Sequence, residues 1–188
     1  MYEEKNRFDS GFCACGGVLM VDAGLDNDVE GDGGLWAGHV FVSYGAFIFF
    51  DATYAEAAIA FGPAMGWTYV GGSGWSETET FNTFAMNFSL LGKFPFKLGS
   101  SFKLFPLVGF GYNMIFKDSP DFNQFGLLFG AGLDYNFQRW EHLYLRAEAL
   151  WSLRFASKAQ KDAADVMPGG SAKMGYGPVV KVGVGYKF

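Results

Sequence analysis

The stretch from Gln124 to Gln138, QFGLLFGAGLDYNFQ, alternates between two kinds of side chain. One set is apolar and mostly large: Phe125, Leu127, Phe129, Ala131, Leu133, Tyr135 and Phe137. The other set mixes Gly and Leu128 with polar residues: Gln124, Gly126, Leu128, Gly130, Gly132, Asp134, Asn136 and Gln138. A period of two predicts a β-strand whose two faces meet different surroundings.

Two later stretches, Leu143–Phe155 and Lys173–Phe188, repeat this alternation. The three predicted strands have about 13 to 16 residues, whereas strands of globular proteins most often have roughly 5–6. A tilted strand crosses a lipid bilayer with roughly 9–11 residues. The length of these strands therefore favours a barrel that spans a membrane.

Upstream, the same pattern predicts five more strands, at Phe12–Val21, Leu35–Gly45, Phe49–Phe61, Phe81–Phe96 and Phe102–Phe116. We expect short turns near Gly45–Phe47, Lys97–Ser101 and Gln138–His142, and long loops at Asp22–Gly34, Gly62–Thr80, Lys117–Asn123 and Ala156–Ala172. Alternation of short turns with long loops is typical of up-and-down membrane barrels. The sequence thus predicts an all-β chain, with one domain over residues 1–188, folded as an up-and-down antiparallel eight-stranded transmembrane β-barrel.

The composition excludes several classes of protein. Aromatic residues make up 19% of the chain and charged residues 18%, and the mean hydropathy is +0.11, which argues against intrinsic disorder. A net charge of -5 and a pI near 5.0 argue against a nucleic-acid-binding protein, which needs a basic face. The longest uncharged stretch, Ala57–Ser76, contains Pro63 and several Gly and does not suit a membrane-spanning helix. The first residues lack the pattern of a secretory signal, so we expect an exported chain to have lost its signal before Met1.

The two faces of the predicted strands indicate which one points inward. A soluble barrel that carries a ligand places large apolar side chains inside, whereas a membrane barrel places them outside. Here the mixed face combines Gly with Asp134, Arg146, Glu148 and Lys181, which suits a narrow lumen. We therefore expect the Phe-rich face to contact lipid, and the alternative is a soluble barrel or sandwich with an aromatic core.

Charged residues are unevenly distributed along the chain. No Lys or Arg lies between Arg7 and Lys93, and Glu56 is the main acid expected to point inward from the first four strands. The predicted charge network of the lumen comprises Glu56, Lys93, Lys103, Asp134, Arg146, Glu148, Arg154 and Lys181. Because buried charges are costly unless they are paired, we favour a salt-bridge network that fills the bore. A charged constriction that filters solutes is the alternative.

Apolar residues also fall on the face expected to point inward. This predicted apolar lumen comprises Leu19, Val21, Phe41, Leu91, Leu107, Leu128, Leu150 and Val179. Pro95, Pro106 and Pro178 lie within or beside predicted strands, where each removes a ladder hydrogen bond. Two interpretations of Pro106 and Pro178 stay open: a break in the barrel wall, or a position near its rim.

The last strand ends in a distinctive pattern. Val180, Val182, Val184 and Tyr186 alternate with other residues, and Phe188 closes the chain on an aromatic ring. This pattern resembles the C-terminal signal by which bacterial outer-membrane barrels are recognised by their insertion machinery. Together with the strand number, strand length and loop pattern, it makes the chain similar to the small outer-membrane barrels of the OmpA transmembrane-domain, OmpX and OmpW type.

The resemblance implies a location in the bacterial outer membrane, with the lipid bilayer and the outer-membrane assembly machinery as partners. A barrel of the OmpW type would pass small, hydrophobic solutes sideways into the membrane from a narrow, largely filled lumen. Two alternatives stay open: a non-conducting structural or surface-interaction barrel, whose second long loop would present Trp67, Tyr69 and Trp75, and a soluble ligand carrier. None of these families has a motif that assigns roles to particular residues here.

Catalytic and metal-binding patterns are incomplete. Asp26–Glu30 begins like a calcium loop, but Ala37 stands where that loop needs a bidentate Glu. A hydrolase needs a His close to a Ser, whereas His39 and Ser43 would lie roughly 13 Å apart along a strand, and His142 falls in a turn. We therefore expect no enzymatic activity, no cofactor, no metal site and no nucleic-acid partner.

Overall fold

The computed structural model describes residues 13–31, 35–72, 74–116, 123–140, 142–166 and 170–187. For residues 13–39, Phe41 and Ala163 the description covers the backbone alone.

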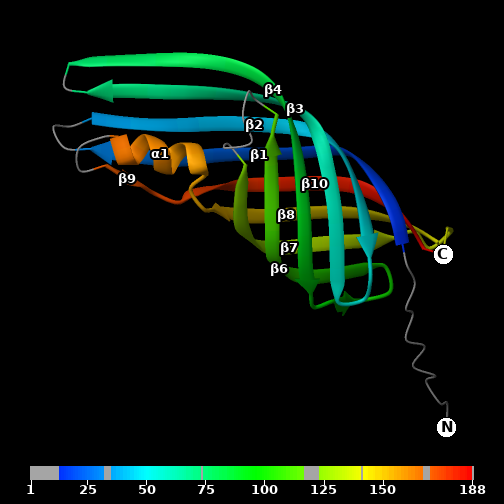
Figure 1. The fold of residues 1–188 in the computed structure, drawn as a ribbon. Coiled ribbons are helices and arrows are strands. Elements are labelled where there is room, and N and C mark those ends of the chain that lie inside the picture. Colours follow the sequence, from blue (N-terminus) through cyan, green and yellow to red (C-terminus); the bar gives the residue numbers. More distant parts are fainter. Residues whose placement is uncertain are drawn as a thin grey trace, which may run out of the picture.

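Eight long strands form a closed antiparallel barrel (Figure 1). Their bounds are β1 (Cys13–Gly31), β2 (Leu35–Asp51), β3 (Ala55–Gly72), β4 (Trp75–Lys93), β6 (Phe102–Ile115), β7 (Gln124–Asn136), β8 (Leu143–Arg154) and β10 (Gly175–Lys187). Each strand pairs with its neighbour in sequence, and β10 pairs with β1, so the sheet closes on itself. Two short strands extend it: β5 (Phe96–Leu98) pairs with β6, and β9 (Ser171–Ala172) pairs with β1. The predicted all-β, up-and-down, eight-stranded fold is confirmed.

The predicted boundaries of the first four strands are wrong. The supposed loops Asp22–Gly34 and Gly62–Thr80 belong mostly to strands, and the supposed turn at Gly45–Phe47 lies inside β2. Gly, Pro and acidic residues in these stretches resemble turn sequences, but their backbone groups are paired across β1, β2, β3 and β4. The β3–β4 hairpin turns tightly after Gly72, where Gly74 adopts a φ of 87° that favours glycine.

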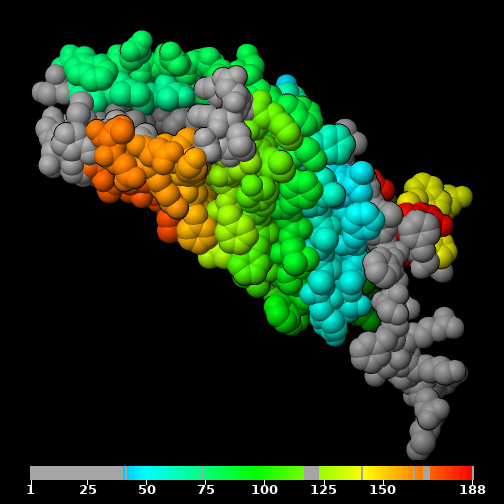
Figure 2. Space-filling view, in the orientation of Figure 1, coloured from blue at the N-terminus to red at the C-terminus, as the bar shows by residue number. Residues whose placement is uncertain are grey.

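The barrel therefore has two unlike ends. At the terminal end, where Cys13 and Lys187 lie, the strands are joined by short connections. At the opposite end, called here the loop end, the first four strands continue beyond the others. The β4–β6 ladder reaches only Ala85 and Ile115, whereas β4 stays paired with β3 as far as Trp75. The β3–β4 hairpin accordingly projects past β6, β7 and β8 (Figures 1 and 2).

Side chains alternate between the two faces of the wall. Along β7 and β10 nearly every second residue is buried, and the residues between them are mostly exposed. The exposed large apolar side chains include Phe50, Leu90, Val108, Phe110, Phe129, Trp151 and Val184. This outward apolar surface is what a lipid-embedded barrel requires, and it is the reverse of the arrangement expected for a soluble carrier.

One helix interrupts the stretch Ala156–Ala172, which was expected to be a loop. Helix α1 (Lys158–Val166) begins with a capping box, in which the Ser157 and Gln160 side chains each accept a hydrogen bond from the other's backbone N–H. Gln160 is buried and is hydrogen-bonded by Gln124 of β7, and α1 also contacts β1 and β9. Within the described ranges, no helix has the length and apolar character needed to cross a membrane.

Candidate functional site

Arg146 is the centre of a buried ion-pair network at the terminal end of the lumen. Its guanidinium donates to both carboxylate oxygens of Asp134, with Nε–Oδ1 and Nη2–Oδ2 distances of 2.7 and 2.9 Å. Nη1 donates to Glu56 Oε2 at 2.5 Å, and Nη2 also donates to Asp51 Oδ2 at 3.0 Å. Arg146 is only 1% exposed. Through these hydrogen bonds, one side chain of β8 links β2, β3 and β7 across the bore.

Two lysines complete this network. Lys93, at the end of β4, pairs with Asp51. Lys181 of β10 places its Nζ 3.4 Å from Glu148 Oε2, 3.9 Å from Glu56 Oε1 and 3.4 Å from the Ser89 hydroxyl. Four carboxylates thus meet three cations, and the pairing offsets much of the cost of burying them.

Aromatic rings close the space around the guanidinium. Arg146 Cζ lies 4.7 Å from the ring centre of Phe49, 4.8 Å from that of Phe105 and 5.3 Å from that of Tyr144. Cation–π contacts of this kind stabilise a desolvated cation. The charged groups and the rings together fill the cross-section of the bore, and we call this set the plug: Phe49, Asp51, Glu56, Lys93, Phe105, Asp134, Tyr144, Arg146, Glu148 and Lys181.

A layer of apolar side chains adjoins the plug on the side of the loop end. Leu91, Leu107, Leu128, Leu150 and Val179 are all buried in one cluster, which also includes Phe47, Ala58 and Ala60. They are five of the residues predicted for the apolar lumen. The side chains of Leu19, Val21 and Phe41 lie outside the described part of the chain.

The remaining predicted charges lie at the margins of the plug or beyond it. Lys103, near the start of β6, is partly exposed and stands opposite Asp134 in the β6–β7 ladder. Arg154 is buried eight residues further along β8 than Arg146, close to the loop end. The sequence interpretation missed Asp51, because the misplaced turn at Gly45–Phe47 put the strand boundary in the wrong place. Its alternation with Phe47 and Phe49 was the available signal.

The C-terminal pattern lies on the outer face. Val180, Val182, Val184 and Tyr186 are between 38% and 49% exposed along β10, whereas Phe188 falls outside the described residues. The same strand pairs with β1 and β8 and so completes the wall.

Two ladders of the wall are interrupted opposite proline residues. The β2–β3 ladder pairs Ser43 with Ala64 and Ala46 with Phe61 but skips the residues between them, which include Pro63. The β1–β10 ladder pairs Asp22 with Val179 and Leu25 with Tyr176 and skips the residues around Pro178. Proline has no N–H to donate to a neighbouring strand, which explains both gaps.

These gaps separate the positions of the two prolines. Pro178 lies where the β1–β10 ladder skips residues, although it stays paired with Trp151 of β8, whereas Pro106 lies where the β4–β6 ladder ends, near the rim. Pro95 lies in the connection between β4 and β5. Pro63 was missed, because its Gly-rich surroundings indicated a loop. The interruptions at Pro63 and Pro178 come just beyond the apolar layer, towards the loop end.

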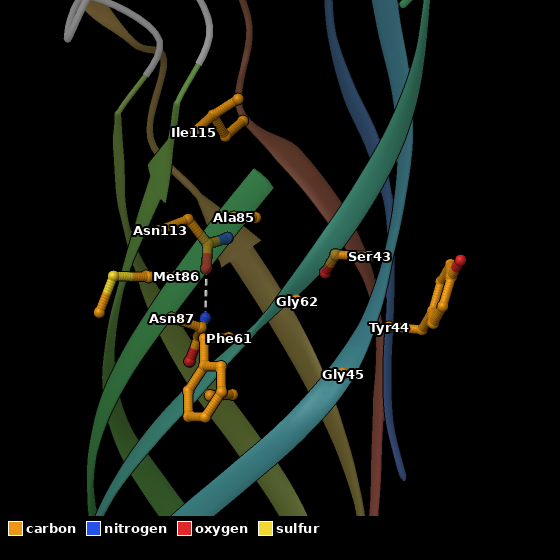
Figure 3. A pocket seen from close by; sticks show the side chains of 11 residues that line it. Ser43, Tyr44, Gly45, Phe61, Gly62, Ala85, Met86, Asn87, Asn113 and Ile115 are labelled. Carbon is orange, nitrogen blue, oxygen red and sulfur yellow. Dashed lines mark hydrogen bonds between the residues drawn. The ribbon is translucent and has the colours of Figure 1, made fainter. Parts of the chain in front are cut away.

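A small cavity lies on the lumen side of the β2–β3 ladder, beside the Pro63 interruption (Figure 3). Ser43, Gly45, Gly62, Asn87, Asn113 and Ile115 are among the residues that line it, and its volume is about 20 Å³. A Cβ on Gly45 or Gly62 would overlap the backbone of the opposite strand. Glycine at these two positions therefore allows β2 and β3 to lie unusually close together here. The spacing of β2 and β3 beside the cavity therefore depends on both glycines.

Within the described ranges, no three His, Cys, Asp or Glu side chains are grouped so that they could hold a metal ion. The backbone of Asp26–Glu30 lies in β1 near its end, rather than in a helix-flanked calcium loop.

A closed eight-stranded barrel with an apolar outer surface and a charged, filled lumen has the fold of the small outer-membrane β-barrels. Among solved structures, the chain is similar in fold to the outer membrane protein OprG from Pseudomonas aeruginosa, with a TM-score of 0.55 and 17% sequence identity. The alignment covers 95% of this chain and 96% of that chain. No protein-family model and no curated protein matches the sequence.

Proposed function

We propose that this chain is an integral protein of the bacterial outer membrane and that it passes small hydrophobic solutes sideways from its lumen into the bilayer. The proposal assigns it no enzymatic activity. The observation that carries it is the position of the two ladder interruptions opposite Pro63 and Pro178, which lie just on the loop-end side of the level at which the bore becomes filled.

The filled half of the lumen argues against straight passage. An eight-stranded barrel has an interior only wide enough for side chains, and here the plug and the apolar layer occupy it. Within the filled half, a solute that comes from the loop end would reach the apolar layer before the charges of the plug. A hydrophobic solute gains nothing by crossing the charges, so its favourable exit is through the wall.

The interrupted ladders supply that exit. Each lacks backbone hydrogen bonds that hold neighbouring strands together, at Pro63 between β2 and β3 and at Pro178 between β1 and β10. The cavity beside Pro63 holds only about 20 Å³, room for a water-sized group. Passage therefore requires the strands to separate locally, and the missing hydrogen bonds lower the cost of that separation.

Replacing Pro63 by Val is expected to slow the passage. Valine restores an N–H donor opposite β2, and one added hydrogen bond of about 0.5–1.5 kcal/mol would lower the population of the open wall about two- to tenfold. The measurement is the uptake of an apolar naphthylamine dye by bacterial cells that carry the protein in the outer membrane. Pro178→Val should act in the same direction.

Pro106→Val is the matched control, because Pro106 is also exposed but lies where its ladder ends. Uptake that is unchanged by both Pro63→Val and Pro178→Val, with the three variants inserted in equal amounts, would contradict sideways passage.

A non-conducting surface-interaction barrel is the second candidate function. The projecting β3–β4 hairpin favours it, since it carries the exposed Trp75, Glu77 and Glu79 beyond the rest of the wall. Dye uptake no greater than in cells without the protein would favour this candidate over passage.

We also propose that the outer-membrane assembly machinery binds the C-terminal strand. Support comes from the outward alternation of Val180, Val182, Val184 and Tyr186 on β10.

A further inference from the structure

The cavity beside Pro63 combines a few polar groups with an apolar lining. Ser43, Asn87 and Asn113 are its polar side chains, and Ala60, Ala85 and Ile115 are among the apolar ones. Of the described residues that line it, none is charged. Such a lining suits a ligand that is apolar apart from one uncharged polar group.

The two asparagines are held in place by the strand register. Asn87 and Asn113 are directly opposite each other in the β4–β6 ladder, and Asn87 Nδ2 donates to Asn113 Oδ1 (Figure 3). Asn113 is 8% exposed. A side-chain amide has two N–H donors and an oxygen with two lone pairs, so after this one hydrogen bond the pair retains capacity both to donate and to accept.

We propose that this cavity is a hydroxyl-binding subsite, and that the solutes of the barrel are small apolar alcohols. This proposal rests on the proposed passage function, and it states which class of solute would leave the lumen through the wall. A hydroxyl group both donates and accepts, as the amide pair does, and the volume of about 20 Å³ suits one group of the size of water.

Other head groups fit the cavity less well. A carboxylate would carry a charge into a lining that offers it no cation, and an unpaired charge is costly to desolvate. An alkane of the same length would make no hydrogen bond with the amide pair or with Ser43. The cavity should therefore bind an alcohol more tightly than a carboxylate or an alkane with the same chain.

Photolabelling of the barrel refolded in lipid vesicles tests this ranking. Three probes share one alkyl-diazirine chain and end in a hydroxyl, a methyl or a carboxylate group. The expected result is that the hydroxyl probe labels peptides containing Ser43, Asn87 or Asn113 about two- to tenfold more than the other two probes, the ratio given by one neutral hydrogen bond. Equal labelling by the three probes would overturn the subsite.

Variants identify the groups responsible. Ser43→Ala and Asn113→Leu should each reduce labelling by the hydroxyl probe to the level of the methyl probe. Ser152→Ala is the control, because Ser152 is a buried serine on β8 that does not line the cavity. Heat-dependent gel mobility verifies that each variant is folded, and a folded Ser43→Ala that labels like the parent contradicts the proposal even if Asn113→Leu does not fold.

The subsite and the passage can fail separately. Equal labelling by the three probes, with dye uptake that still falls in Pro63→Val, overturns the subsite and leaves the passage standing. Hydroxyl-selective labelling that depends on Ser43, with dye uptake unaffected by both Pro63→Val and Pro178→Val, supports the binding site and overturns sideways passage.

Discussion

Replacing Arg146 by Met is expected to destabilise the folded barrel by about 3–5 kcal/mol, the cost of removing one partner from a buried ion-pair network. The guanidinium makes hydrogen bonds to Asp51, Glu56 and Asp134, and its removal leaves the four carboxylates of the plug, three of them buried, with only Lys93 and Lys181. The measurement is the free energy of unfolding in urea for protein inserted in lipid vesicles, followed by tryptophan fluorescence.

Arg139→Met is the control for this experiment, because Arg139 is exposed in the connection between β7 and β8. Surface substitutions of this kind usually change stability by no more than about 0.5 kcal/mol. The Arg146 variant should also show larger ion-conducting steps in planar bilayers, since its side chain occupies the bore. Equal unfolding free energies for the two variants would contradict a plug held together by Arg146.

Replacing Val108 by Arg is expected to cost about 2–4 kcal/mol of folding stability in a bilayer, the range for a cationic side chain at the midplane of a membrane barrel. Val108 is 56% exposed on the outer face and lies at the middle of β6, with apolar Phe110 as its exposed neighbour on the same face. The charge would have to leave water for hydrocarbon. Unfolding from vesicles measures the cost.

Phe94→Arg is the matched control, because Phe94 is 57% exposed but lies at the terminal end, beyond β4. Near the interface the cost of Arg falls to about 0–1 kcal/mol. The difference between the two positions reports depth in the bilayer. If both variants lose the same free energy, the outer apolar surface does not face lipid in the manner proposed.

The amino-acid alternation by itself determined the strands and their faces in the second half of the chain. From Phe102 onward the predicted ranges differ from β6, β7, β8 and β10 by only a few residues. In a barrel wall each second side chain meets lipid and the next meets the lumen, so the local sequence carries the period directly. Arg146, Glu148 and Lys181 could be placed on the inward face for the same reason.

The first four strands could not be bounded from the sequence. Residues 22–34 and 62–80 contain Gly, Pro and acidic residues that locally favour turns, and their strand conformation comes from pairing with neighbouring strands. Helix α1 was missed for a related reason: it is short, and its capping box and its contact with Gln124 stabilise it.

Only the tertiary structure decided which inward charges meet. Asp51 and Arg146 are far apart in sequence, and their contact follows from the register of the five ladders that lead from β2 through β3, β4, β6 and β7 to β8. The cavity likewise requires β2, β3, β4 and β6 to bring Ser43, Asn87 and Asn113 together. Strand period is a local property that each segment carries alone, whereas register, closure and the partners of a buried charge depend on the whole sheet.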